Sequence, residues 1–286
     1  MKKIYFPKAW GETNVLDMFI HQTPNNSGIW DDVVAVNNKE DSDFIIVQDG
    51  TNENVDYNKV IYFGREPHYI QGINPKWLNN SCYRFFHHEM NNSWMPQTWW
   101  VGLGFNELLE LNSPTKTKNL SVIESGKKMA YGHKKRNEIL NKLISKGSDY
   151  IDVYGKTTIG RENKGPYKTR LPHRKKEIGL LDYKYNLAIE NGSTDFYFSE
   201  KIVDPLLCWT MPIYWGCKNI DKFLPKGSYI NIDIDNPNVV EEIVDISKSN
   251  IREENIELIA EARDLIINKY NLWPSIKRAI ENKNMF

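Results

Sequence analysis

Short apolar runs alternate with a helical stretch in the first third of the chain. The runs at 3–6, 43–48 and 60–64 are typical of buried strands, and the second ends at the turn signal Asp49-Gly50. Residues 14–20 have the pattern of a capped helix. Because strands alternate with helical residues, this part of the chain is predicted to form a small α/β layer.

A polar stretch at 111–118 contains a proline and has no hydrophobic period. Residues 74–100 before it also lack a clear period, and we expect loops there with one strand near 82–86. Such a polar, aperiodic segment is typical of a domain boundary. The sequence therefore predicts an N-terminal α/β domain over 1–115 and a C-terminal domain over 116–286.

The order of elements is clearer in the second domain, where strand, helix and strand repeat. This order predicts a doubly wound parallel sheet. From residue 237 to the end the chain is predicted to be helical, with one apolar face at helical spacing. The predicted strands are 119–123, 150–153, 185–189, 211–215 and 229–232, and the predicted helices before residue 237 are 134–146 and 200–208.

Charge and cysteine content exclude several classes of protein. Lys plus Arg and Asp plus Glu both total 37, so the chain lacks the basic excess of a general nucleic-acid or membrane-surface binder. The three cysteines form no CxxC pair, which argues against a zinc site or a disulfide framework. The N-terminus lacks the apolar run of a signal peptide, and no run reaches the length of a membrane span. We expect a cytoplasmic protein whose association with membranes, if any, is peripheral.

The densest group of polar residues follows the predicted strand at 185–189. Asn191 lies at the carboxyl end of that strand, a glycine-containing loop follows, and Ser199 occupies the cap position of the next helix. Ligands bind at such strand ends in open α/β sheets, and a helix N-terminus offers free N–H groups to anions. Lys201 is unfavourable for the helix dipole in the first turn, which makes sense if it pairs with a phosphate.

Three blocks of sequence surround this group: residues 183–191 read YKYNLAIEN, residues 198–201 read FSEK, and residues 211–216 read MPIYWG. They resemble the patterns YKFxLxFEN, YxTEK and PVYWG of the α1,3/4-fucosyltransferase family, glycosyltransferase family 10. Order and spacing agree as well. The resemblance is strong over about 121–233 and faint before it.

The resemblance implies an α/β fold of the GT-B type, with two Rossmann-like domains facing a cleft and helices at the C-terminus. The C-terminal domain would bind the nucleotide-sugar donor, and the N-terminal domain would bind the acceptor. Matching positions imply five donor-binding residues: Arg136, Asn191, Tyr197, Glu200 and Lys201. Arg136 and Lys201 would contact the diphosphate, and Glu200 the hydroxyls of the sugar or ribose. From the residues alone, Arg136 could equally belong to a solvated face of a basic helix.

The resemblance places the general base in the N-terminal domain. Glu66 follows the strand at 60–64 and matches the family segment that holds a catalytic glutamate. A carboxylate there could take the proton of an acceptor hydroxyl. Two alternatives stay open: Glu89 as the base, and Glu66 as a structural partner of Arg65.

No cofactor and no metal are expected, because the family needs neither. Asp233-Ile234-Asp235 resembles a DxD metal motif, but it follows a predicted strand and reads better as a loop with capping acids. His87-His88-Glu89 lacks the HExxH spacing that places two histidines on one helix face. Aromatic rings that could stack on an acceptor sugar, or pack in the core instead, are Trp77, Trp94, Trp99 and Trp100.

Taken together, the sequence predicts an inverting, metal-independent glycosyltransferase. It would move L-fucose from GDP-fucose to a hydroxyl of a glycan acceptor, in an α1,3-type linkage. Departures from the family pattern at Ser199, Pro205, 208–210 and 124–125 bear on the sugar that is transferred. The alternatives are the same fold with another nucleotide deoxysugar, and a non-catalytic module that binds a glycan or nucleotide.

Overall fold

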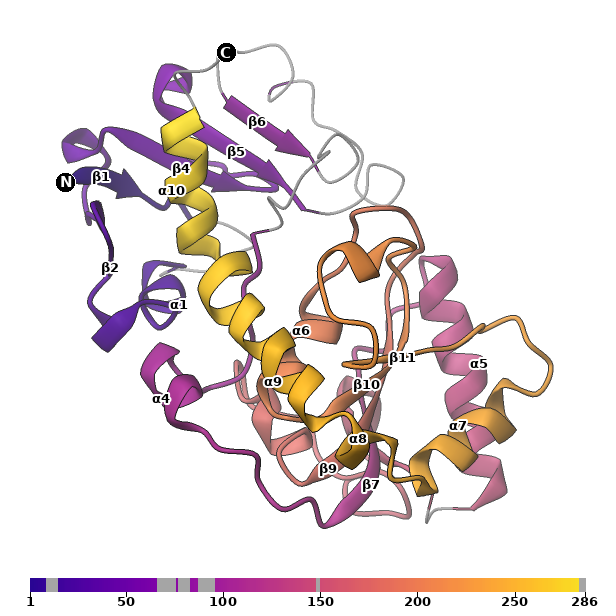
Figure 1. Cartoon of the computed structure of the whole chain (residues 1–286). Coiled ribbons are helices and arrows are strands. Elements are labelled where there is room, and N and C mark those ends of the chain that lie inside the picture. Colours follow the sequence, from indigo (N-terminus) through magenta and orange to yellow (C-terminus); the bar gives the residue numbers. More distant parts are fainter. Residues whose placement is uncertain (9–14, 66–75, 77–82, 87–95, 148–149, 283–286) are drawn as a thin grey trace. The chain divides into compact units, whose positions relative to one another are not determined.

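The computed structural model divides into two compact units. It describes residues 1–8, 15–65, 76, 83–86, 96–147 and 150–282. Unit 1 comprises Met1–Thr98, Leu103–Glu110 and Ile267–Phe286, and unit 2 comprises Trp99–Gly102 and Leu111–Ile266. Each unit has its own sheet, as the two-domain fold class predicts (Figure 1).

Unit 1 is built on a mostly parallel sheet of six strands in the order β2-β3-β1-β4-β5-β6. Only the β2–β3 pair is antiparallel. Helices α1 (Val15–Ile20) and α4 (Phe105–Glu110) also belong to this unit. The strands are β1 (Lys2–Tyr5), β2 (Ile29–Trp30), β3 (Val33–Ala35), β4 (Phe44–Gln48), β5 (Val60–Gly64) and β6 (Tyr83–Phe86).

Unit 2 is built on a wholly parallel sheet of five strands in the order β11-β10-β9-β7-β8. Helix α5 (Tyr131–Lys146) packs with α7 (Val239–Lys248) on one side of the sheet, and α6 (Glu200–Leu207) packs with α9 (Ile256–Leu265) on the other (Figure 1). The strands are β7 (Lys118–Glu124), β8 (Asp152–Gly155), β9 (Tyr183–Ile189), β10 (Met211–Trp215) and β11 (Ile230–Asn231).

Most predicted strands and helices are present, within a few residues at their ends. The two-residue β2 and three-residue β3 were missed, because so short a run has no readable period. Helix α5 begins at Tyr131, three residues before the predicted start at 134. None of the described helices combines the length and the apolar content that a membrane crossing requires.

The last segment of the chain differs from the predicted division at 116–286. Helix α10 (Leu272–Asn282) groups with unit 1, so the predicted C-terminal domain loses residues 267–286. The reason is the indole of Trp273, which is fully buried, donates to the carbonyl of Phe19 at 2.8 Å and meets the Phe6 ring edge-on. An aromatic side chain of that size is stabilised most where it leaves water completely.

The start of α5 approaches the end of β9 closely, and this contact requires a glycine. The Gly132 N–H donates to the carbonyl of Asn191 at 3.1 Å. A Cβ atom at position 132 would lie 1.9 Å from the carbonyl oxygen of Glu190, which belongs to the rigid backbone. The missing side chain therefore lets the N-terminus of α5 reach the carboxyl edge of the sheet.

Gly132→Ala should destabilise the protein by roughly 2–3 kcal/mol, although alanine is the better helix former, because helix and strand end must separate. Chemical denaturation of the variant and of Lys134→Ala measures this. Lys134 is exposed on the same helix, so its truncation should change stability by less than about 0.5 kcal/mol. Equal stabilities of the two variants would contradict the close contact.

Candidate functional site

A buried carboxylate, Glu190, organises the loop that follows β9. It has no solvent exposure, and it accepts hydrogen bonds from the Ser199 N–H at 2.8 Å and the Ser199 hydroxyl at 2.6 Å. The Lys201 ammonium lies 3.3 Å from the same carboxylate. Charge-assisted bonds of this kind are needed to keep an ionised carboxyl buried. Glu190 therefore fixes both the cap and the first-turn lysine of α6.

A second buried carboxylate, Glu124, ends β7 and pairs with Arg136 of α5. The Arg136 Nε–H donates to Glu124, and one terminal nitrogen donates to the carbonyl of Ile189 at 2.8 Å. The Arg136 side chain is only 4% exposed, which overturns the reading of a solvated helix face. Arg136 thus joins the carboxyl ends of two neighbouring strands.

His133 lies one helical turn from Arg136, beside Asn191. Burial and the neighbouring Arg136 charge lower the pKa of His133, and so does Lys201. The ring therefore stays neutral near pH 7, and its Nδ1 accepts a hydrogen bond from the Ala130 N–H at 3.1 Å. Asn191 is buried against this helix start, as its carbonyl contact with Gly132 requires.

Glu200 and Lys176 form the more open side of the group. The Lys176 ammonium lies 3.5 Å from Glu200 and 2.9 Å from Asp204, both of which belong to α6. Burial by itself would raise the pKa of Glu200, but Lys201 and Lys176 outweigh it and hold that pKa below its usual range. Glu200 is therefore an anion at neutral pH. Its side chain is 28% exposed and that of Lys201 is 20% exposed, so both can reach a ligand.

The short segment Trp99–Gly102 is anchored on the same group. The Trp100 N–H donates to Asp204 at 2.9 Å, and the Lys176 N–H donates to the carbonyl of Trp100 at 3.2 Å. The Gly102 N–H donates to Glu177 at 2.6 Å. Asp204 therefore contacts both the Trp99–Gly102 segment and Lys176, the lysine beside Glu200.

Of the remaining predicted site residues, Tyr197 is buried within unit 2, so its contact with a ligand stays a prediction. Trp99 is buried and Trp100 is partly exposed. The candidate bases, the His87-His88-Glu89 motif and two candidate acceptor rings lie outside the described residues: Glu66, Glu89, Trp77 and Trp94.

Asp233 and Asp235 behave as loop acids in the structure. Asp233 accepts the backbone N–H of Asp235 at 2.9 Å, and Asp235 pairs with Lys135 at 2.6 Å and accepts the hydroxyl of Tyr131. The predicted loop is present, and Asp233 caps its turn, but neither acid caps a helix, since Asn238 occupies the N-cap position of α7. Over the described residues, no three His, Cys, Asp or Glu side chains gather as metal ligands do. Independence of metal stays a prediction.

An anion at the carboxyl edge of the unit 2 sheet would meet the N-termini of two helices, α5 and α6, and two cations, Lys201 and Lys176. The N-termini of α5 and α6 both lie at the carboxyl ends of parallel strands, where N–H groups and helix dipoles favour negative charge. The buried groups hold this edge in place, while Lys201 and Lys176 remain partly exposed around Glu200. The site can thus bind a phosphate group beside a carboxylate that accepts hydroxyl hydrogens.

Comparison with known proteins agrees with this geometry. Residues 113–250, which contain the whole edge, match the model described as glycosyltransferase family 10 (fucosyltransferase), C-terminal. Over these residues the chain contains a glycosyltransferase family 10 domain. The predicted family is thereby confirmed, and the match covers unit 2 from just after its boundary at Leu111 to the end of α7.

Two curated relatives of this family 10 chain are fucosyltransferases. An α-(1,3)-fucosyltransferase of Helicobacter pylori is 40% identical over 53 residues, which is 18% of this chain and 11% of the relative. A 3-galactosyl-N-acetylglucosaminide 4-α-L-fucosyltransferase of Bos taurus is 31% identical over 86 residues, 29% of this chain and 21% of the relative. The chain therefore aligns with only about a tenth to a fifth of the length of these relatives.

A solved structure shows the same fold over the whole family 10 chain. HepE of Anabaena, in complex with UDP-glucose, superposes with a TM-score of 0.55 over 100% of both chains at 9% identity. At such low identity the likeness concerns the fold alone. It agrees with the predicted GT-B type of two Rossmann-like domains.

Sequence reasoning missed the buried partners of this site. Glu190 and Glu124 stood in the sequence without a role, and His133, Lys176 and Asp204 were not singled out. The block at 183–191, which resembles the family pattern, was the available signal for Glu190. For Lys176 no signal existed, since its partners lie 24 and 28 positions away on a helix that only the fold brings near.

Asp204→Asn should change how stability depends on pH. Burial raises the pKa of Asp204 from 3.8 to about 6, Lys176 lowers it, and Glu200 raises it. Between these values the folded state binds more protons than the unfolded state, so Asp204 lowers stability as pH rises. The free energy of unfolding of the variant, relative to wild type, should therefore rise by up to about 3 kcal/mol from pH 4 to pH 6.

Denaturation at a series of pH values measures this difference. Asp245→Asn, at an exposed position on α7, is the matched control and should show the same difference from wild type at every pH. A flat profile for Asp204→Asn as well would show that Asp204 has no raised pKa.

Proposed function

We propose that this family 10 chain transfers L-fucose from GDP-fucose to a hydroxyl of a glycan acceptor, with inversion and without a metal. The proposal rests on Lys201 and Glu200, two partly exposed and oppositely charged side chains at the start of α6. Both lie inside the segment that matches the family. Both relatives named as fucosyltransferases support fucose as the transferred sugar, and the α-(1,3) name of the Helicobacter pylori relative supports the α1,3-type linkage.

The donor would lie along the carboxyl edge of the sheet in unit 2. Its diphosphate would face the starts of α5 and α6, with Lys201 as the nearest exposed cation. Glu200, an anion at neutral pH, would accept hydrogens from sugar or ribose hydroxyls. Arg136, which is buried and paired with Glu124, would add positive charge near the diphosphate without being exposed to it. Asn191 and Tyr197 would make the remaining contacts with the donor.

The reaction would be a single displacement. The acceptor oxygen attacks the anomeric carbon, the bond from that carbon to the β-phosphate oxygen breaks, and GDP leaves with the bonding electrons. The acceptor proton passes to a carboxylate, for which we propose Glu66, with Glu89 as the alternative. Inversion at the anomeric carbon of a β-linked donor gives an α-fucoside. Fixed cations near the leaving diphosphate stabilise its charge, so the step needs no metal.

A panel of nucleotide sugars tests the donor. In buffer that contains EDTA, the protein should bind GDP and GDP-fucose in calorimetry and should hydrolyse or transfer GDP-fucose in preference to UDP-linked sugars and to other GDP-linked sugars. Binding of UDP-sugars alone would exclude fucose as the transferred sugar. Loss of turnover in EDTA that added Mg²⁺ or Mn²⁺ restores would contradict metal independence.

Two variants should separate donor binding from chemistry. Lys201→Gln removes a charge-assisted contact and should weaken GDP binding about 10- to 100-fold. Glu66→Gln should leave GDP affinity unchanged and lower turnover by about 100-fold or more. Calorimetry with GDP and a transfer assay on both variants measure the two effects.

Lys142→Gln, on the exposed face of α5, is the control for loss of a lysine and should match wild type in both assays. Unchanged GDP affinity in Lys201→Gln would place the donor elsewhere. If Glu89→Gln and not Glu66→Gln lost turnover, Glu89 would be the base. A wild-type protein that binds GDP but turns nothing over would be the non-catalytic module.

A further inference from the structure

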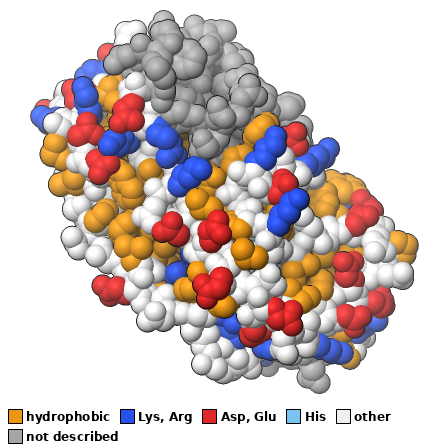
Figure 2. All heavy atoms as spheres, viewed as in Figure 1, with side chains coloured by type: hydrophobic (Ala, Val, Ile, Leu, Met, Phe, Trp, Pro, Cys, Tyr) orange, Lys and Arg blue, Asp and Glu red, His pale blue; other side chains and the backbone are white. Residues whose placement is uncertain are grey.

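Residues 156–170 form a basic loop that the proposed reaction does not use. The loop turns back on itself at the bridge between Lys164 and Tyr167, and we call it the basic hairpin. It contains five cations and a single carboxylate, Glu162, in a chain whose basic and acidic totals are both 37. Elsewhere the charges are mixed: Figure 2 shows basic and acidic side chains interspersed over the face that it displays. The hairpin is therefore a local positive excess on a neutral protein.

The basic hairpin is held firmly against β8, the edge strand of the sheet in unit 2. The Val153 N–H donates to the carbonyl of Pro166 at 2.8 Å, and the Lys168 N–H donates back to the carbonyl of Val153 at 2.9 Å. The Gly155 N–H donates to the carbonyl of Thr169 at 3.1 Å. These bonds cover an otherwise open sheet edge and give the hairpin a fixed position.

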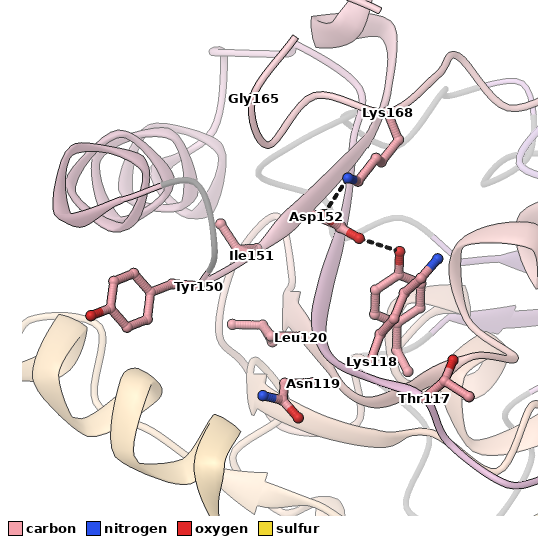
Figure 3. Close-up of a pocket in the computed structure, with 10 residues that line it drawn as sticks. Thr117, Lys118, Asn119, Leu120, Tyr150, Ile151, Asp152, Gly165 and Lys168 are labelled. Carbon is pink, nitrogen blue, oxygen red and sulfur yellow. Dashed lines mark hydrogen bonds and ion pairs between the residues drawn. The ribbon is translucent and has the colours of Figure 1, made fainter. Parts of the chain in front are cut away.

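The inner side of the hairpin closes a polar cavity of about 360 Å³, in which the charges are balanced (Figure 3). Lys168 points into the cavity and pairs with Asp152 at 2.9 Å, and Asp152 also accepts the hydroxyl of Tyr183. On the opposite wall Lys118 pairs with Asp182 at 3.5 Å. The positive excess therefore comes from the cations of the hairpin that do not line the cavity.

The outer side, meaning the exposed residues of the hairpin that do not line the cavity, includes four cations and one aliphatic side chain. In the parts of the chain that the structure describes, no carboxylate lies within ion-pair distance of four exposed cations: Lys156, Arg161, Lys164 and Arg170. Arg161 instead stacks over the ring of Tyr167 at 5.1 Å, which keeps its charge at the surface. Ile159, between the first two cations, is 57% exposed.

We propose that the basic hairpin docks unit 2 onto the anionic headgroups of a lipid bilayer. Unpaired cations on a fixed support are attracted to the negative surface potential of such a bilayer, and an exposed isoleucine among them can enter the boundary with the acyl chains. An acidic polysaccharide would also attract the cations, but it offers nothing apolar to Ile159. The surface charge and the exposed aliphatic residue together favour the bilayer. This docking does not depend on the identity of the donor.

Sedimentation with lipid vesicles tests the proposal. The full chain should bind vesicles of phosphatidylcholine mixed with phosphatidylglycerol and should bind pure phosphatidylcholine much more weakly, with an affinity that falls as salt is added. The triple variant Lys156→Gln, Lys164→Gln, Arg170→Gln should lose about fivefold in affinity for each cation, or about 100-fold in all. Ile159→Ser should weaken binding to the mixed vesicles further.

A matched triple variant at dispersed exposed lysines, Lys2→Gln, Lys142→Gln and Lys226→Gln, should bind the mixed vesicles nearly as well as wild type. GDP binding and circular dichroism should be the same for wild type and both triple variants. Equal losses in both triples, or no vesicle binding by wild type at low salt, would overturn the proposal. So would retention on an acidic polysaccharide column that the hairpin triple loses and Ile159→Ser keeps, since that result identifies a polysaccharide surface.

Discussion

Burial of the Glu190 carboxylate at the end of β9 requires hydrogen-bond donors, and the next turn of the chain supplies them. Ser199 donates twice, and the Lys201 ammonium provides the opposite charge. An ionised carboxyl without these partners could not stay out of water. The requirement fixes the start of α6, and with it Glu200 on the open side of the edge. The placement of the candidate site follows from one buried charge.

The second buried pair, Glu124 with Arg136, fixes the position of the start of α5, as Glu190 fixes the start of α6. It ties the helix to the ends of β7 and β9, while the absent side chain of Gly132 lets the helix start come close enough. Both helix starts are thereby held at one edge of a parallel sheet, where ligands of such folds bind. Lys201 and Lys176 are partly exposed at this edge, whereas Arg136 is buried and paired with Glu124.

The same unit separates two kinds of positive charge. At the carboxyl edge every described cation near the site is paired with a carboxylate, which gives a charge balance that a bound diphosphate would shift. On the outer side of the basic hairpin the cations have no such partners among the described residues. Paired charges position groups with accuracy, whereas unpaired charges at the surface attract an anionic partner. The two regions are therefore suited to different tasks.

Most elements of unit 2, the family and the stretch proposed to hold the site could be predicted from the sequence, because the hydrophobic period and the block at 183–191 are local properties of the chain. Three features became visible in the folded chain alone. Arg136 is buried, Glu124 and Glu190 are the buried acids at the carboxyl edge of the sheet, and Lys176 pairs with both Glu200 and Asp204. The tertiary structure also placed α10 with unit 1. These features depend on contacts between residues that lie far apart in the chain. Burial of a single charged side chain produces no periodic pattern in the sequence, so these contacts could not be predicted from it.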